Sequence, residues 1–253
     1  MRVSALLALG ALCGATVFAQ NQPLPPELQR RAYVRRVSAG VTFTVPVLTQ
    51  FVTGFDYFAR ETPPLEASVE SNTRRSYAGG GLTLQFAVTE RTAINLSALL
   101  RKAEFTTQRT EIAGVDNPNT LIDDRVRTDI RESVRLRYLD FPILVRYYTR
   151  GHHQRGDRWF LQAGPNFRSV RRLRDNIKTT AQDGAVTEAN TPLPPYTRRV
   201  TGITAGFGAQ LIDPVGVRVI PEVRYTRWLD PQFKLFGVQS RRDHIEVMIS
   251  FTF

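Results

Sequence analysis

The three histidines are the side chains of this chain best suited to acid–base or metal chemistry at neutral pH. His152 and His153 are adjacent in a predicted turn near Asp157, so their rings point in different directions and a shared metal site is not expected. His244 is the only histidine in a predicted strand. Ser250 lies on the same predicted face, but at the rise of a strand it is roughly 20 Å from His244. A serine hydrolase needs these two groups within hydrogen-bonding reach.

Other serines remain open as partners for His244, among them Ser38 and Ser97. The G-x-S-x-G motif, which places a nucleophilic serine on a sharp turn in one large class of hydrolases, does not occur in the sequence. We therefore expect a protein that is not an enzyme and that holds no metal or other cofactor. A lipid-modifying enzyme that uses His244 stays as an alternative.

Charged residues alternate with apolar ones in the segments 135–148, 217–226 and 244–253. A period of two residues indicates half-buried strands. Both signs of charge are present, so the charges can pair inside a closed structure, where an unpaired charge is costly. We predict an interior ion-pair network of Asp140, Arg146, Arg218, Glu222, Arg224 and Glu246.

The first 19 residues predict a secretory signal peptide, with one positive charge at Arg2, an apolar run and small residues before cleavage after Ala19. Cys13, the only cysteine, lies inside this signal. Removing Arg2 leaves 33 basic against 23 acidic residues, a mature net charge of +10. Such a charge suggests nucleic acid in a cytoplasmic protein, but the export signal argues against that partner.

Eight alternating segments predict an all-β, antiparallel, up-and-down transmembrane β-barrel over residues 35–253, after a flexible leader at 20–34. Long polar loops are predicted at 46–72, 109–130 and 174–197, with shorter turns between them and a moderate loop at 230–240. Long loops face outside and short turns face the periplasm in such barrels. The predicted strands are 37–45, 74–88, 94–101, 135–148, 159–166, 204–211, 217–226 and 244–253.

The kind of residue that faces the interior distinguishes this predicted barrel from a soluble one. A soluble lipid-binding barrel carries its apolar residues inside, whereas here the inside would hold the charged residues of the predicted network. An eight-stranded lumen is about filled by side chains. We therefore predict a filled lumen, with a narrow channel for small solutes as the alternative.

Three segments resemble the PorT-type outer-membrane β-barrel domain family. They are residues 138–147 (YLDFPILVRY), residues 160–165 (FLQAGP) and the terminal alternating strand that ends in Phe253. The resemblance implies an eight-stranded barrel in a Gram-negative outer membrane. It also implies insertion by the barrel-assembly machinery, for which Phe251 and Phe253 would be the assembly signal. It carries over no catalytic residue, and we do not transfer a secretion role.

Basic residues gather at the strand ends that this topology places outside, where guanidinium groups could contact lipopolysaccharide phosphates through bidentate hydrogen bonds. The alternative is a set of solvated bases in contact with lipid headgroups in general. The predicted basic rim comprises Arg74, Arg75, Arg171, Arg172, Arg198, Arg199, Arg241 and Arg242, with Arg101, Lys102, Arg131, Arg174 and Arg227 nearby. Aromatic girdles are predicted from Tyr147, Trp159, Tyr225, Trp228, Phe251 and Phe253.

Taken together, these patterns predict a small outer-membrane barrel with a structural role or a surface role in binding or adhesion, carried by its long loops. The expected partners are the outer-membrane lipid and lipopolysaccharide and, during insertion, the assembly machinery. No ligand, protein partner or oligomeric state follows from the sequence.

Overall fold

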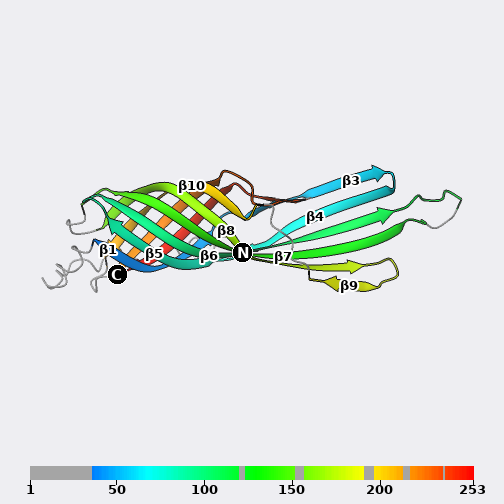
Figure 1. Ribbon diagram of the computed structural model, residues 1–253, viewed down its shortest axis with the longest axis horizontal. Coiled ribbons are helices and arrows are strands. Elements are labelled where there is room, and N and C mark those ends of the chain that lie inside the picture. Colours follow the sequence, from blue (N-terminus) through cyan, green and yellow to red (C-terminus); the bar gives the residue numbers. More distant parts are fainter. Residues whose placement is uncertain (1–35, 120–122, 152–156, 191–196, 213–216, 236) are drawn as a thin grey trace.

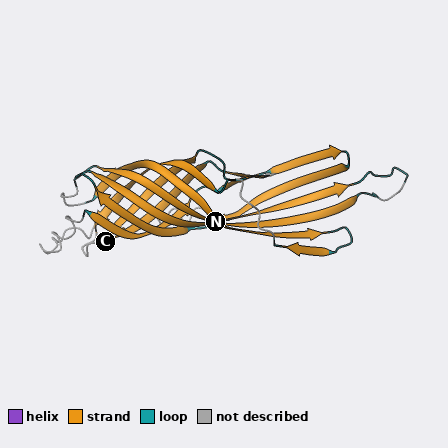
Figure 2. Cartoon of the chain, in the orientation of Figure 1, coloured by secondary structure: helices purple, strands orange, loops and turns teal. Residues whose placement is uncertain are grey.

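The computed structural model describes residues 36–119, 123–151, 157–190, 197–212, 217–235 and 237–253. The predicted signal peptide, the predicted leader and the pair His152 and His153 lie outside these residues. Every regular element of the described part is a β-strand (Figure 2). Among the described residues, no helix is long and apolar enough to cross a membrane.

Eight strands close into an antiparallel barrel in the order β5-β1-β14-β11-β10-β8-β7-β6, and the pairing of β6 with β5 completes the ring. The seam between the two ends of the chain runs from Gly40 opposite Thr252 to Pro46 opposite Glu246. The prediction of an eight-stranded, up-and-down barrel is confirmed. The barrel strands are β1 (Val37–Pro46), β5 (Gly79–Ala87), β6 (Thr92–Ala113), β7 (Val126–Tyr148), β8 (Arg158–Thr180), β10 (Arg199–Ile212), β11 (Arg218–Trp228) and β14 (Asp243–Thr252).

The two faces of the barrel wall differ in chemistry. Along β14 the side chains of His244, Glu246 and Ser250 point inward and are buried. Large apolar side chains point outward and stay exposed, for example Leu161 at 68 % and Phe207 at 53 %. A continuous exposed apolar band is costly in water, but it is what lipid requires.

Beyond one end of the barrel, several strands continue as a long open sheet, opposite the end where the C-terminus lies (Figure 1). β3 (Phe55–Glu61) pairs with β4 (Pro64–Ser76), and β4 follows the outer part of β6 as far as Leu65 opposite Ala113. β8 turns back into β9 (Val186–Ala189). We call this sheet, built from β3, β4, β9 and the outer parts of β6, β7 and β8, the extension.

The predicted long loop at 46–72 is therefore wrong over most of its length, and the predicted loops at 109–130 and 174–197 are wrong at the ends where β6, β7 and β8 continue and where β9 lies. The physical reason is that the extension has no lipid-facing side. Every residue of β3 is exposed, so burial imposes no alternation of apolar and polar residues on it. Without burial on one face, a strand loses the two-residue period that makes it visible in a sequence.

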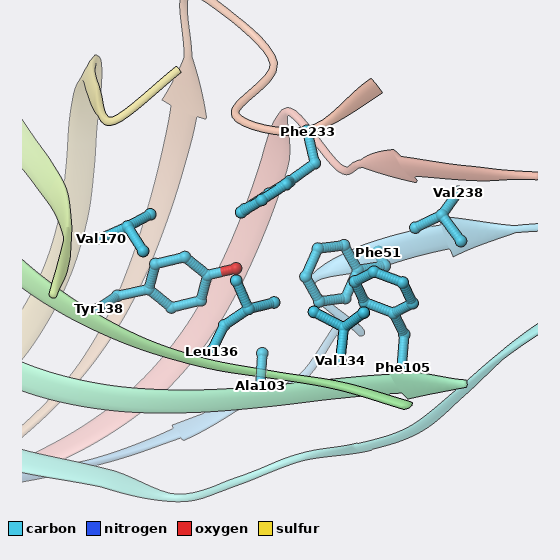
Figure 3. Close-up of a cluster of buried hydrophobic side chains, with 9 residues drawn as sticks. All are labelled: Phe51, Ala103, Phe105, Val134, Leu136, Tyr138, Val170, Phe233 and Val238. Carbon is cyan, nitrogen blue, oxygen red and sulfur yellow. The ribbon is translucent and has the colours of Figure 1, made fainter. Parts of the chain in front are cut away.

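A second, three-stranded sheet covers the mouth of the barrel at the base of the extension. It is formed by β2 (Phe51–Thr53), β12 (Lys234–Leu235) and β13 (Val238–Ser240), which come from the predicted loops at 46–72 and 230–240. Phe51, Phe233 and Val238 point from it toward inward-facing side chains of β6, β7 and β8 (Figure 3). We call the resulting apolar cluster the cap; its buried members are Phe51, Ala103, Phe105, Val134, Leu136, Tyr138, Val170, Phe233 and Val238.

Candidate functional site

The middle of the lumen is filled by one connected group of polar side chains. Arg146 on β7 forms an ion pair with Glu222 at 2.7 Å and donates to Gln162 at 2.9 Å and to Gln85 at 3.0 Å. The other carboxylate oxygen of Glu222 lies 2.6 Å from Arg224. Arg146 is only 1 % exposed. Side chains from four strands therefore meet at the barrel axis and leave little surface open to water.

A second ion-pair layer lies between this group and the cap. Arg168 donates two hydrogen bonds, of 2.8 and 2.9 Å, to the carboxylate of Asp140. Arg101 lies 2.9 Å from the same carboxylate and also pairs with Glu246. All four side chains are buried. The arrangement balances two guanidinium groups against two carboxylates, which is how a charged group is tolerated away from water.

All six residues of the predicted interior network lie in the lumen, including Arg218, which is buried on β11. The predicted strand ended at residue 166, whereas β8 continues to Thr180, so Arg168 was not among the predicted lumen residues. The prediction that Arg101 lies near the outer rim is wrong, because Arg101 points inward at 4 % exposure. The sequence does indicate the inward direction, since Arg101 follows Asn95 and Ser97 at every second position along β6.

Aromatic rings line the lumen beside the arginines. Trp228 is buried at 3 % exposure and lies under the Arg168 guanidinium, so its predicted place in an aromatic girdle is wrong. A ring face stabilises a buried cation that has already lost its water. The distances from guanidinium carbon to ring centre are 4.5 Å for Arg146 and Phe160, 4.4 Å for Arg158 and Tyr148, 4.8 Å for Arg168 and Tyr138, and 4.1 Å for Arg168 and Trp228.

His244 is a buried part of this packing. Its Nε2 lies 3.1 Å from the carbonyl oxygen of Arg241, and its ring meets Trp228 edge to face. Ser250 instead shares a 2.8 Å hydrogen bond with Thr42, and Ser97 bonds to Thr83. The described residues thus bring no serine into hydrogen-bonding contact with His244. They also contain no group of three His, Cys, Asp or Glu side chains that could hold a metal ion.

Only some residues of the predicted basic rim have exposed side chains in the described part of the structure. Arg171, Arg172, Arg198, Arg199 and Arg242 are exposed. Arg241 is half-buried and donates from Nε to the carbonyl oxygen of Thr49 at 3.1 Å. Arg74 and Arg75 lie on β4, and their side chains are outside the described part of the structure.

The predicted assembly residues lie at the closing seam. Phe251 faces outward and packs edge to face against Phe43 on β1, with ring centres 6.4 Å apart. The backbone N–H of Phe253 donates to the carbonyl oxygen of Ala39 at 2.9 Å. Among the other predicted girdle residues, Tyr147, Trp159 and Tyr225 are exposed.

The inner face of the extension holds a pair of acidic side chains above the cap. Glu132 on β7 and Asp175 on β8 are neighbours, since Asp175 is the cross-strand partner of Val134. Burial and the nearby Asp175 carboxyl raise the pKa of Glu132 to about 7, against the lowering effect of Arg109. Burial also raises the pKa of Asp175. The two neighbouring carboxyl groups therefore have higher pKa values than ordinary acidic side chains.

The outward face of the extension carries a small pocket lined by polar and charged residues. Exposed aromatic side chains stand beside it, because Phe55, 68 % exposed, is the cross-strand partner of Glu70, and Tyr57, 58 % exposed, follows on the same face. The lining residues are Glu70, Asn72, Thr106, Gln108 and Arg131. A pocket, both charge signs and exposed rings thus occur together on this surface.

The sequence itself carries a family signature that agrees with this architecture. Residues 18–232 match the model of the outer membrane protein beta-barrel domain. The chain belongs to this family. It is accordingly a protein of the bacterial outer membrane, and its exposed apolar band faces lipid. Outer-membrane barrels keep their short turns in the periplasm, which predicts that the extension faces the outside of the cell.

Solved outer-membrane proteins of similar shape share little sequence with the chain. OprG from Pseudomonas aeruginosa has a TM-score of 0.41 and 16 % identity, over 85 % of this chain and 92 % of its own. Ail, the attachment invasion locus protein of Yersinia pestis, has a TM-score of 0.33 and 8 % identity, over 87 % and 100 % of the two chains. LpxR from Salmonella typhimurium has a TM-score of 0.31 and 10 % identity, over 85 % and 100 %. We found no match among curated proteins.

Proposed function

We propose that this protein is a closed outer-membrane barrel that presents a binding surface on its extension, and that it neither conducts solutes nor catalyses a reaction. The observation that carries the proposal is the contrast between a lumen filled by paired charges and a long sheet outside the membrane whose outward face carries exposed aromatic and polar side chains. The barrel then acts as an anchor, and the extension provides the contact with molecules outside the cell.

Closure of the lumen is supported at three levels. The Arg146 group fills the middle, the Asp140 layer lies above it, and the apolar cap covers the outer mouth. A narrow channel would need a continuous path of water past Arg146, Glu222 and Arg224. These groups bond to one another instead, and separating them would expose charges that have lost their partners.

The outward face of the extension supports the binding role. Contiguous exposed apolar groups often mark interaction sites, and Phe55 and Tyr57 lie on one face of β3 next to the pocket. Amide, carboxylate and guanidinium groups around a hollow provide donors and acceptors at fixed positions, and a neighbouring ring offers a flat apolar face. We infer that the surface suits a ligand rich in hydroxyl groups, such as an oligosaccharide.

The absence of catalysis is supported by His244, whose ring nitrogen faces the Arg241 carbonyl while Ser250 faces Thr42. Within its family we assign the chain to the PorT type, on the segments 138–147 and 160–165 and the terminal strand. We do not assign it a role in secretion.

The binding role is tested with the purified, detergent-solubilised barrel on an oligosaccharide array. The parent protein is expected to bind a subset of the glycans, and the double variant Phe55→Ser/Tyr57→Ser is expected to lose that binding. Val115→Ser/Val186→Ser is the matched control, since Val115, just beyond the end of β6, and Val186 on β9 are both exposed. Binding that survives the aromatic substitutions, or that fails equally in the control, would remove the proposed surface.

A further inference from the structure

A block of basic side chains covers the outward face where β6, β7 and β8 leave the barrel. Arg137 on β7 is the direct cross-strand partner of Lys102 on β6 and of Arg172 on β8. Two residues further along, Arg135 is the partner of Arg174. All five side chains are exposed. Direct partners lie roughly 5 Å apart at their Cβ atoms, so the bases form a compact patch; we call it the cationic ladder.

An irregularity in β8 adds a sixth base. The register between β7 and β8 shifts where Arg137 faces Arg172 and Tyr138 faces Val170, which leaves Arg171 as an extra residue. The alternation of faces breaks there, so Arg171 and Arg172 are both exposed while Val170 stays buried in the cap. Such bulges redirect side chains at the rims of barrels.

The ladder is short of negative charge. In the described part of the chain, Arg135 is the only member with an ion pair, to Glu104 at 3.4 Å. Glu104 is also engaged by the hydroxyl of Tyr77 at 2.9 Å. Like charges directly opposite each other destabilise a sheet. An anion placed between Arg135, Arg137, Arg172 and Arg174 would turn this repulsion into attraction.

The position of the ladder along the membrane normal is defined by the residues below it. Leu100 and Leu139, direct partners on β6 and β7, form the last apolar row beneath Lys102 and Arg137. Ten residues separate the girdle residue Tyr147 from Arg137 along β7, which is roughly 33 Å of strand. At a tilt of roughly 40° this spans roughly 25 Å, the thickness of the apolar band of outer-membrane barrels.

We propose that the cationic ladder is a binding site for a phosphorylated lipid of the outer leaflet, of the lipid A type. Each guanidinium can hold a phosphate through two parallel hydrogen bonds. The acyl chains of the same lipid would lie against Leu100, Phe141 and Phe167, which are exposed directly below the ladder. This continuity of cation and apolar surface favours a lipid over a soluble anion.

The opposite side of the barrel provides a matched control. Arg227 on β11 is an exposed base at the same end of the barrel, but it pairs with Asp243 at 2.9 Å. Its charge is already balanced, so it should add little to the binding of a phosphate. The ladder thus differs from Arg227 in that most of its charges have no acidic partner in the described part of the chain.

The test is a titration of the full mature protein in detergent micelles, with bound lipid counted by native mass spectrometry. The probes are bisphosphorylated lipid A, dephosphorylated lipid A and inorganic pyrophosphate. We expect the quadruple variant Arg135→Gln/Arg137→Gln/Arg172→Gln/Arg174→Gln to bind lipid A roughly tenfold more weakly or worse, since several charge-assisted hydrogen bonds are lost. The Arg227→Gln variant should bind as the parent does.

A second variant, with all four arginines changed to lysine, keeps the charge and guards against a failure of the glutamine variant to fold. It should lie between the parent and the glutamine variant, because lysine cannot form the bidentate contact. The proposal is overturned if the glutamine variant binds lipid A as tightly as the parent. It is also overturned if pyrophosphate binds as tightly as lipid A, or if lipid A without phosphate does.

Discussion

Inside the barrel, β6 and β7 have one face in lipid and the other in a closed lumen, whereas beyond Lys102 and Arg137 the outer face of the same strands meets water. The change of surroundings alters how much an ion pair contributes to stability. In the lumen, Asp140 is fully buried and holds two arginines. In the extension, Asp129 pairs with Arg127 at 3.3 Å while both remain about half exposed. The same kind of ion pair should therefore be essential in one region and nearly neutral in the other.

The largest expected effect comes from removing Asp140. Asp140→Ala leaves Arg101 and Arg168 buried without their shared carboxylate, which typically costs about 3–5 kcal/mol. Asp129→Ala in the extension should cost about 1 kcal/mol or less, as exposed pairs do. Both losses of stability are measured by unfolding in urea, with the folded fraction read from the heat-modifiable shift of the barrel on a gel. Similar losses for the two variants would show that the two regions do not differ in this way.

The cap offers the same comparison for apolar residues. Phe51 is 2 % exposed and packs against Phe105 with ring centres 4.9 Å apart, whereas Phe55 is 68 % exposed. Phe51→Ala should destabilise the cap by about 3–5 kcal/mol, and Phe55→Ala should change stability by about 0.5 kcal/mol or less. Hydrogen exchange of β2 and β13 amides reports the local loss. Faster exchange in the Phe55 variant would contradict this prediction.

The closing seam should matter more for assembly than the extension does. Deleting Phe253 removes the hydrogen bond to Ala39 and the terminal aromatic side chain. We expect a clear fall in the amount of folded protein in the outer membrane, because the last strand must pair with β1 to remove both sheet edges. Shortening the β8–β9 turn at 181–184 is the control. An unchanged amount after loss of Phe253 would argue against its role in assembly.

The smallest effect concerns pH and is confined to the extension. The pKa of Glu132 is raised to about 7 by burial and by Asp175, so the folded extension holds a proton that the unfolded chain releases. Stability is then fully present below the ordinary glutamate pKa and falls as pH rises toward 7. The protection factors of amides in the outer part of β7, which are corrected for the intrinsic rise of exchange with pH, should fall over this range. Glu132→Gln should flatten the response, and an unchanged pH dependence in that variant would assign the effect to other groups.

The sequence predicted the regions in which burial repeats every second residue. The lumen and lipid faces of β7, β11 and β14 follow from the alternation around Asp140, Arg224 and Glu246 because each strand separates two different media. Trp228 was misplaced because the girdle was predicted from residue type, although Trp228 keeps the inward phase of Arg224 and Thr226 along β11. The fold of the barrel was predictable because each of these strands has one face in lipid and the other in the lumen.

The extension and the cap were not predictable in the same way. β3 and the outer parts of β6 to β8 meet water, so their sequences resemble polar loops. The cap is built from short segments far apart in the chain, and no local pattern links Phe51 with Phe233. The cationic ladder depends on cross-strand register and on a one-residue bulge, and neither is visible until the strands are paired.

Conductance in planar lipid bilayers tests the central claim, a barrel closed by the lumen ion pairs and by the cap. The purified parent protein is predicted to give no discrete openings, and Phe51→Ala/Phe233→Ala should stay closed because the Arg146 and Asp140 layers remain. Stable, discrete openings of the parent protein would contradict the closed barrel and favour the channel.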